Sequence, residues 1–236
     1  MLSVLLLNFL LKSQEVVLTK KYTKEQVIKT VTKCAVQYCT HLMDKSLLFI
    51  TTDKHKKISA AEVFFEKWNY LHLTGLIVDK TVISAERFLD MCVSQKLSPH
   101  DFEIREDGTT KLKLDILPFL MTKNLSANAI GNYNGSGMEL YTEKIAGSVK
   151  GCMGFRTDGI THHLVPNTIL NKDIRLCTNY PQDRIIAAFR KRKEDVKYSE
   201  IVYIAKKVDW HKLKFPEEYT YLYNLIKNSR ISPTQK

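Results

Sequence analysis

Three histidines are candidates for proton transfer. They are His72, in the segment LHLTG at residues 71–75, and the adjacent pair His162 and His163, just before VPNT at residues 165–168. A histidine titrates near neutral pH and can give or take a proton, as cleavage of a phosphodiester by a neighbouring 2′-hydroxyl requires. On a strand, His162 and His163 would face opposite sides, so at most one of them would enter a given site. Each histidine could instead have a purely structural role.

Three cationic residues, Lys144, Arg190 and Lys206, lie in segments that favour strands. Cleavage of a phosphodiester passes through a phosphorane with extra negative charge, and fixed ammonium or guanidinium groups stabilise it without reorganising. A strand aims a side chain more rigidly than a loop does, so these three residues are candidates for that task. The alternative is that each side chain extends from a sheet edge into solvent.

The chain carries 36 Lys and Arg against 25 Asp and Glu, a net charge of +11 over 236 residues. This excess favours a polyanionic partner, because each phosphate that a cation neutralises releases bound counterions. Residues 184–214 are especially basic and are interleaved with Phe189, Tyr198, Tyr203 and Trp210. Cations beside aromatic rings suit RNA, whose unstacked bases can stack on the rings. The alternative is a solvated sheet face with a basic turn at residues 190–193.

Several chemistries are disfavoured because their motifs are absent. The glycine-rich residues 131–137 lack the Lys-Ser/Thr of a Walker-type phosphate loop, so a hairpin turn is the better interpretation. Five cysteines without a C-x-x-C pair indicate neither disulfides nor zinc, and fit a reducing cytoplasm. Without a metalloenzyme or paired-Asp motif, we expect no metal and no cofactor. The apolar residues 1–11 are too short to span a bilayer and favour the start of a buried helix, with a weak secretion signal as the alternative.

The spacing of apolar residues predicts mostly helices in the first part of the chain and mostly strands in the second. Helices are expected at residues 23–45, where Thr23 and Gln26 form a capping box, from Ser59 through Leu71, after Ser84, and at residues 217–226. Strands are expected at residues 46–51, 127–133, 139–145, 149–155, 162–165, 184–191 and 200–206. The predicted fold class is α+β, with N-terminal helices packed on an antiparallel β-sheet of about four to six strands and a C-terminal helix.

Five short segments stand in an order that is more specific than any of them alone. They are LHLTG at 71–75, LYTEKIAG at 140–147, VPNT at 165–168, RIIA at 184–187 and YIAKK at 203–207. Together they resemble the phage-associated branch of the barnase, EndoU, colicin and RelE-like nucleases, the BECR fold, over roughly residues 64–210. The resemblance implies helices packed on a four-stranded antiparallel sheet, acting as a metal-independent endoribonuclease. We therefore expect a nuclease domain at residues 61–236 and a helical extension at residues 1–60.

The resemblance also implies roles for residues in and near the matched segments. His72 is expected to transfer the proton, Lys144 and Arg190 to clamp the phosphate, and Thr168 or Tyr203 to orient groups by hydrogen bonds. The expected substrate-binding residues are Asn167, Lys206, His162, His163 and Lys191.

The leading functional hypothesis is a phage- or mobile-element-associated toxin or effector that cleaves RNA, such as tRNA or mRNA, by attack of the 2′-hydroxyl. An antitoxin or a host protein is a further possible partner, no membrane partner is expected, and the residues indicate no particular oligomeric state. The alternative is a catalytically inactive phage protein that binds nucleic acid or a host protein as an inhibitor or regulator. A DNA-binding regulator has weaker support, because no helix-turn-helix with a basic recognition helix stands out before Lys57.

Overall fold

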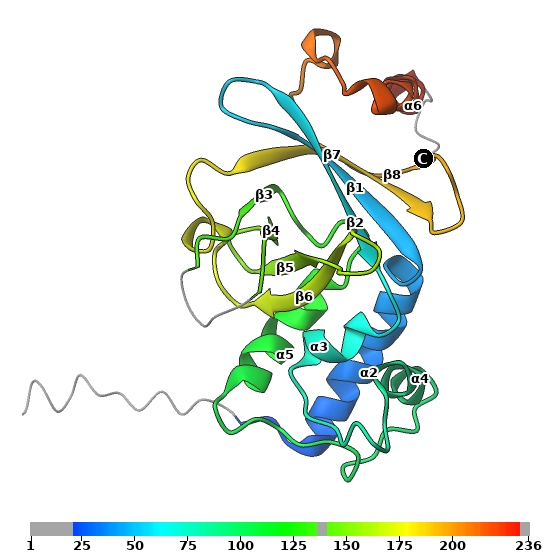
Figure 1. Ribbon diagram of the computed structural model, residues 1–236, viewed down its shortest axis with the longest axis vertical. Coiled ribbons are helices and arrows are strands. Elements are labelled where there is room, and N and C mark those ends of the chain that lie inside the picture. The colour runs from blue at the N-terminus through cyan, green and yellow to red at the C-terminus, as the bar shows by residue number, and fades with distance from the viewer. Residues whose placement is uncertain (1–20, 136–140, 232–236) are drawn as a thin grey trace, which may run out of the picture.

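The structure, a computed structural model, describes residues 21–135 and 141–231. Helices α2 to α5 lie together at one end of the molecule, the strands fill the middle, and α6 lies at the opposite end (Figure 1). The helix expected to begin within residues 1–11 falls outside the described residues.

Two helices begin at the caps that the sequence predicts. At the start of α2 (Lys24–His41), the Thr23 hydroxyl accepts a hydrogen bond from the backbone N–H of Gln26, and the Gln26 side chain accepts one from the backbone of Thr23. At the start of α4 (Ala85–Val93), the Ser84 hydroxyl accepts a hydrogen bond from the backbone N–H of Arg87. The other helices are α3 (Asn69–Thr74), α5 (Thr109–Leu120), α6 (Tyr221–Ile231) and the 3-10 turns η1 (Ile174–Leu176), η2 (Trp210–Lys212) and η3 (Glu217–Tyr219). Within the described residues, no helix combines the length and the apolar character that crossing a membrane requires.

The strands form one sheet that closes on itself. They are β1 (Lys45–Thr52), β2 (Ile58–Phe65), β3 (Ala129–Asn132), β4 (Lys144–Gly147), β5 (Cys152–Thr157), β6 (Leu164–Leu170), β7 (Asp183–Arg192) and β8 (Glu200–Ile204). Their order is β1-β2-β6-β5-β4-β3-β7-β8, and β1 also pairs with β7, so seven strands make a ring from which β8 extends. The pairs are antiparallel except β2 with β6, which pair in parallel at Val63 and Leu164.

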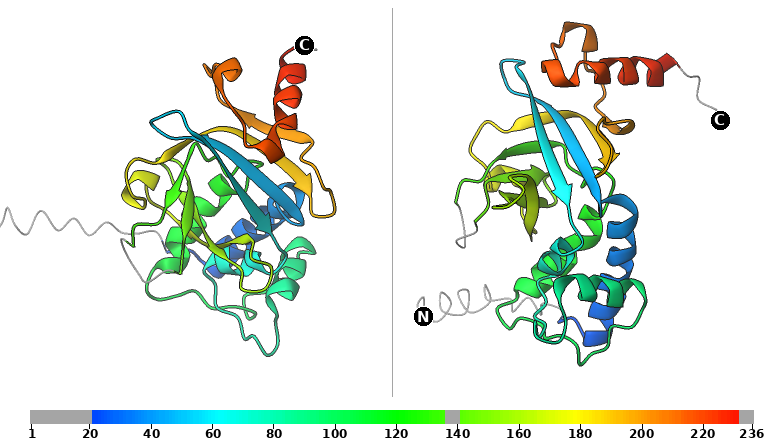
Figure 2. Two further views of the ribbon diagram at one scale, coloured as in Figure 1. Left: turned by 45° about the horizontal axis from the view of Figure 1, so that its top comes forward. Right: turned by 45° about the vertical axis from the view of Figure 1, so that its right-hand side comes forward.

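The main hydrophobic core lies between the inner face of this ring and helices α2 to α5. Leu47 and Phe49 of β1, Phe155 of β5 and Ile185 of β7 contribute to it from the strands. A second core covers the outer face of β1 and β7, where Leu222 and Ile226 of α6 and Trp210 of η2 pack. Figure 2 shows this C-terminal segment on the side of the sheet opposite the helical layer. The ring is therefore packed on both sides where β1 and β7 run together.

The predicted helix from Ser59 through Leu71 was wrong, because its first half is strand β2. Residues of β2 pair in register with the whole of β1, from Lys45 opposite Phe65 to Thr52 opposite Ile58. Ala61 and Val63 face the main core while Ala60 faces the second one, which is the alternation of a strand buried on both faces. The alanines and Glu62 favour a helix locally, and pairing with β1 overrides that preference. Only its last three residues, from Asn69 to Leu71, are helical, as the start of α3.

The α+β class is confirmed, and the expected number of strands was too low. The sheet has eight strands rather than four to six, and β2 is the strand among them that was expected to be a helix. Helix α5 had no counterpart among the predicted elements. The predicted domain boundary between residues 60 and 61 falls inside β2, and the division into two regions stays a prediction.

Candidate active site

A pocket of about 300 Å³ opens where helices α3 and α5 meet strand β6. It contains one predicted site residue from each of two distant segments, His72 of α3 and Asn167 of β6. Its cationic lining comes from three residues outside the matched segments, Lys80, Arg105 and Lys113. We call this hollow the His72 pocket.

Helix α3 is held against β6 by the buried side chain of Asn69. Its Oδ1 accepts a hydrogen bond from the backbone N–H of Glu66 at 2.8 Å, and its Nδ2 donates to the carbonyl of Pro166 at 3.2 Å. Asn69 is 0 % exposed, so both bonds are shielded from competing water. The amide therefore fixes the short helix that carries His72 relative to the strand that carries Asn167.

The end of α3 is fixed to helix α5 by Thr74, Gly75 and Thr110. Gly75 ends the helix with φ of 71°, a left-handed conformation that glycine adopts without steric cost. The Thr110 hydroxyl donates to the carbonyl of Gly75 at 2.7 Å and accepts from the backbone N–H of Arg105 at 3.1 Å. The Thr74 hydroxyl bonds within its own turn, to the carbonyl of Leu71. The residues Leu-Thr-Gly after His72 thus have a structural role that positions the pocket walls.

Lys113 brings a positive charge to the backbone of His72. Its Nζ donates a hydrogen bond to the carbonyl oxygen of His72 at 2.7 Å. Burial, with the nearby positive charge of Arg105, lowers the pKa of the Lys113 ammonium to about 8. This lysine is therefore largely protonated at neutral pH and loses its proton only slightly above it.

The His72 imidazole sits partly exposed among cations. Burial lowers its pKa below the ordinary value, and the positive charges of Lys113, Lys80 and Arg156 lower it further. At neutral pH the imidazole is therefore mostly neutral and can accept a proton.

Asn167 occupies a β-bulge that directs it toward this pocket. Gly154 pairs with Thr168 and Phe155 with Pro166, which leaves Asn167 as the extra residue of β6. Its Nδ2 donates to the carbonyl of Tyr141 at 2.9 Å and lies 3.1 Å from the Thr142 hydroxyl. The segments LHLTG, LYTEKIAG and VPNT therefore meet here, through residues of α3, of the segment just before β4, and of β6.

Three cations around the His72 pocket are free to meet an anion. Within residues 21–135 and 141–231, the side chains of Lys80, Arg105 and Arg156 make no ion pair. Asp107 is the acidic residue among those that line the pocket. The local field is therefore positive and suits a phosphate.

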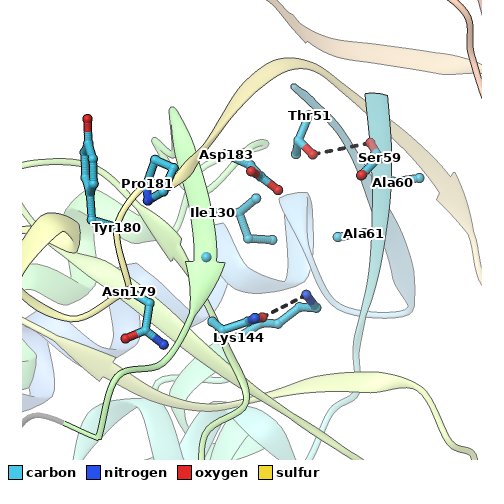
Figure 3. A pocket seen from close by; sticks show the side chains of 12 residues that line it. Thr51, Ser59, Ala60, Ala61, Ile130, Lys144, Asn179, Tyr180, Pro181 and Asp183 are labelled. Carbon is cyan, nitrogen blue, oxygen red and sulfur yellow. Dashed lines mark hydrogen bonds between the residues drawn. The ribbon is translucent and has the colours of Figure 1, made fainter. Parts of the chain in front are cut away.

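Lys144 lies in a different hollow, which we call the mouth pocket (Figure 3). Its Nζ donates to Oδ1 of Asn132 at 3.2 Å. The mouth pocket is formed by strands β1 to β4 and the chain leading into β7. The structure therefore does not bring Lys144 into the His72 pocket.

Arg190 and Lys191 of β7 form ion pairs with carboxylates of neighbouring strands, Glu200 of β8 and Glu62 of β2. The Arg190 guanidinium donates to both carboxylate oxygens of Glu200 at 2.7 Å and to the carbonyl of His41 at 2.7 Å. The Nζ of Lys191 is 3.4 Å from Glu62 and 4.8 Å from the centre of the Tyr198 ring. Neither residue lines the His72 pocket or the mouth pocket. The phosphate-clamp role of Arg190 stays a prediction.

The remaining predicted residues are spread over the sheet. Thr168 is 3 % exposed and lies opposite Gly154 of β5. Tyr203 on β8 packs against both hydrophobic cores. Lys206 is exposed just after β8, where its carbonyl accepts from Arg184 at 3.3 Å. None of the three lines the His72 pocket.

The predicted histidine pair lies in and after a turn. The backbone N–H of His162 donates to the carbonyl of Asp158, and its φ is 57°. His163 stacks on the ring of Phe64 with centroids 4.1 Å apart. Both precede β6 instead of lying within it, and neither lines the His72 pocket.

The pocket combines a neutral imidazole, a lysine that titrates at about 8, and free cations. Together these side chains can remove a proton from a hydroxyl, hold a phosphate, and return a proton to a leaving oxygen. Within the described parts of the chain, no three His, Cys, Asp or Glu side chains are grouped so that they could hold a metal ion. Sequence reasoning missed Lys80, Arg105 and Lys113, because no motif marks them. Lys113 reaches His72 only through the packing of α5 on α3, and Lys80 and Arg105 lie in the loops that follow α3 and precede α5.

Comparison with known proteins gives one match. Residues 30–207 match the model of the family described as phage-Barnase-EndoU-ColicinE5/D-RelE like nuclease4. No curated protein and no solved structure matches the chain. The matched range contains the His72 pocket, the mouth pocket and the whole ring of strands.

Proposed function

Since the chain belongs to the phage-Barnase-EndoU-ColicinE5/D-RelE like nuclease4 family, and so to a nuclease class, we propose that it cleaves RNA at the His72 pocket without a metal ion. One observation carries this proposal: the ammonium of Lys113 is held at the carbonyl of His72, in a pocket whose Lys80 and Arg105 make no ion pair with the described residues. In such a site, side chains supply both proton transfers and the charge stabilisation of phosphodiester cleavage.

In the first step, His72 acts as the general base. Its lowered pKa leaves the imidazole neutral, so it can take the proton of the RNA 2′-hydroxyl. The oxygen then attacks the adjacent phosphorus, and the new P–O bond gives a phosphorane. Asn167, whose amide is oriented by Tyr141 and Thr142, lies on the other wall and would position the ribose or the phosphate.

In the second step, Lys113 acts as the general acid. Arg105, Lys80 and the Lys113 ammonium stabilise the negative charge of the phosphorane. As the P–O5′ bond breaks, Lys113 gives a proton to the leaving oxygen, which its pKa of about 8 makes easier than for an ordinary lysine. The products are a 2′,3′-cyclic phosphate and a 5′-hydroxyl. DNA, which has no 2′-hydroxyl, is not cleaved by this route.

Paired substitutions test these roles. His72→Ala should lower the rate of RNA cleavage about 10²- to 10⁴-fold, because it removes the base. His100→Ala is its control, since His100 is exposed and lines neither pocket. Lys113→Met should also abolish most cleavage, whereas Lys111→Met, on the same helix but paired with Asp115, should not. Cleavage that is unchanged in folded His72→Ala would refute the proposal.

The cellular role we propose is that of a toxin or effector, in keeping with the phage-associated description of the family. Induced expression in bacteria should then stop growth and fragment cellular RNA. His72→Ala should relieve the arrest at equal protein levels. Growth arrest of equal strength with His72→Ala would argue for a role in binding rather than in cleavage.

A further inference from the structure

The mouth pocket collects a polar side chain from each of five strands at one end of the ring (Figure 3). These side chains are Thr51 of β1, Ser59 of β2, Asn132 of β3, Lys144 of β4 and Asp183 of β7. The pocket has a volume of about 220 Å³, several times the roughly 30 Å³ that a water molecule occupies in the liquid. It is large enough for a small ring system.

Below the ring of polar side chains, the same face of the sheet is apolar. Two residues further into each strand, the same face carries the apolar residues Phe49, Ala61, Ile130, Ala146 and Ile185, which belong to or pack against the main core. Because strand side chains alternate, these positions share a face with the five polar residues. The pocket thus has polar walls above an apolar floor, the usual composition of a small-molecule site.

Asp183 is the acidic residue among those that line this pocket. Among the described residues, its carboxylate makes no hydrogen bond and no ion pair, although the side chain is half buried. Burial raises the pKa of this carboxyl, and the negative charge of Asp53 raises it further. A carboxylate that is partly shielded from water and has no protein donor can accept hydrogen bonds from a ligand that offers N–H groups.

Lys144 offers the complementary donor. Its ammonium donates one hydrogen bond to Asn132, and its two other N–H groups can donate to another acceptor. Lys144 is close enough to favour the charged form of Asp183, yet the two form no ion pair among the described residues. A flat ligand with donors at one end and an acceptor at the other would bridge the two.

We propose that the mouth pocket binds a nucleobase that carries an amino group at one end of its pairing edge and a carbonyl oxygen at the other. Guanine and cytosine have this arrangement, whereas adenine lacks the carbonyl and uracil lacks the amino group. The amino group would donate to Asp183, and Lys144 would donate to the carbonyl oxygen. Tyr180, 89 % exposed at the rim, offers a ring on which a neighbouring base can stack.

The source of the base is the RNA substrate, so this inference rests on the proposed function. The backbone runs directly from Tyr141 and Thr142, which contact Asn167 of the His72 pocket, to Lys144 of the mouth pocket. Tyr141 is 86 % exposed between them. A strand of RNA cleaved at His72 can therefore place a flanking base in the mouth pocket, which would give the cleavage its sequence preference.

The direct test is a binding measurement with short RNAs that cannot be cleaved because every ribose is 2′-O-methylated. Four oligonucleotides would carry a single G, C, A or U within an abasic background, and free guanosine and cytidine would be measured beside them. We expect G and C to bind about tenfold more tightly than A and U, the usual scale for one well-placed base contact. Equal affinity for the four bases would overturn the inference without any variant. Binding of the free nucleosides as tight as that of the oligonucleotides would overturn the RNA as the source of the base.

Two isosteric or near-isosteric variants locate the preference. Asp183→Asn and Lys144→Met should each reduce the preference for G and C to about threefold or less, and Glu194→Gln, an exposed carboxylate outside both pockets, should leave it unchanged. Preference that persists in both folded variants would contradict the assignment.

The outcomes also separate this inference from the proposed function. His72→Ala should keep the preference for the G and C oligonucleotides over the A and U ones, while it loses cleavage. Base preference at the mouth pocket without any RNA cleavage would leave the inference standing and remove the proposed function. Cleavage that depends on His72 but shows no base preference would do the reverse.

Discussion

At the scale of residues, the environments of His72 and Lys113 give the proposed base and the proposed acid different pKa values. Burial and three neighbouring cations lower the pKa of His72, so it is available as a base near neutral pH. Burial and Arg105 lower the pKa of Lys113 to about 8, so it can act as an acid there. Two titratable groups adjusted in this way define a window of pH in which both are in their active forms.

The rate of RNA cleavage should follow a bell-shaped dependence on pH. The rate rises as His72 loses its proton, below the ordinary histidine pKa of 6.5, and falls as Lys113 loses its proton at about 8. Lys113→Arg keeps the positive charge but holds its proton above pH 12. We expect this variant to be slower and to lose the fall near pH 8, as initial rates from pH 5 to 10 would show. A fall near pH 8 that persists in Lys113→Arg would exclude Lys113 as the acid.

The sequence identifies part of the site at this scale. His72 and Asn167 come from matched segments far apart in the chain, and the structure brings them to one pocket. Lys144, from a third segment, enters a different pocket, and Arg190 is engaged with Glu200. The side chain type predicts which chemistry a residue can do, but its partners depend on tertiary packing. Nothing in the order of residues 80, 105 and 113 shows that they surround His72.

At the scale of elements, short contacts between α3, α5 and β6 align the site. Asn69 fixes α3 to β6, and Thr110 fixes the end of α3 to α5. The caps of α2 and α4 could be predicted because they depend on residues three positions apart. Strand β2 could not, because its pairing with β1 decides its conformation against the local helical preference of its alanines and Glu62.

Gly75 provides a test of this alignment. An added Cβ at Gly75 would lie 2.9 Å from Cδ of Lys113, and its φ of +71° is unfavourable for other residues. Gly75→Ala should lose about 1–2 kcal/mol of stability from the backbone and should also displace Lys113, which lowers kcat. Gly135→Ala is the matched control, since Gly135 has φ of +73° but no atom of the described residues within 4 Å of an added Cβ.

Urea unfolding and steady-state kinetics would measure the two effects separately. Both variants should lose similar stability, and only Gly75→Ala should lose activity when fully folded. Equal activity of the two variants would show that Lys113 need not keep its position against α3.

At the scale of the whole molecule, the closed ring depends on the pairing of β1 with β7. Arg190 reinforces this junction, because its guanidinium reaches Glu200 on β8 and the carbonyl of His41 at the end of α2. One side chain thereby connects the sheet to the helical layer. Alternating strands such as β7 and β8 are predictable from sequence, but the return of β7 to β1, nearly 140 residues away in the chain, is not.

Arg190→Ala should lower the free energy of unfolding by about 2 kcal/mol, since it leaves the His41 carbonyl without its donor and leaves Glu200 with only the looser contact to Lys123 at 3.6 Å among the described residues. Arg192→Ala should change it by less than about 0.5 kcal/mol, because Arg192 and Glu194 form an exposed pair at 3.9 Å. Urea unfolding of both proteins measures the difference. Similar losses for the two variants would contradict the role of Arg190 at the junction. A fall in RNA cleavage by folded Arg190→Ala would support the predicted phosphate contact in addition.

The central claim is that side chains of the His72 pocket cleave RNA through its own 2′-hydroxyl, and the most direct measurement is an analysis of product ends. The protein would be incubated in EDTA with an end-labelled RNA and with the same RNA carrying a single 2′-deoxy substitution at the cleaved nucleotide. We predict cleavage of the first RNA to a 2′,3′-cyclic phosphate and a 5′-hydroxyl, and none at the substituted position. Cleavage at the deoxynucleotide, or products that carry a 5′-phosphate, would contradict the account.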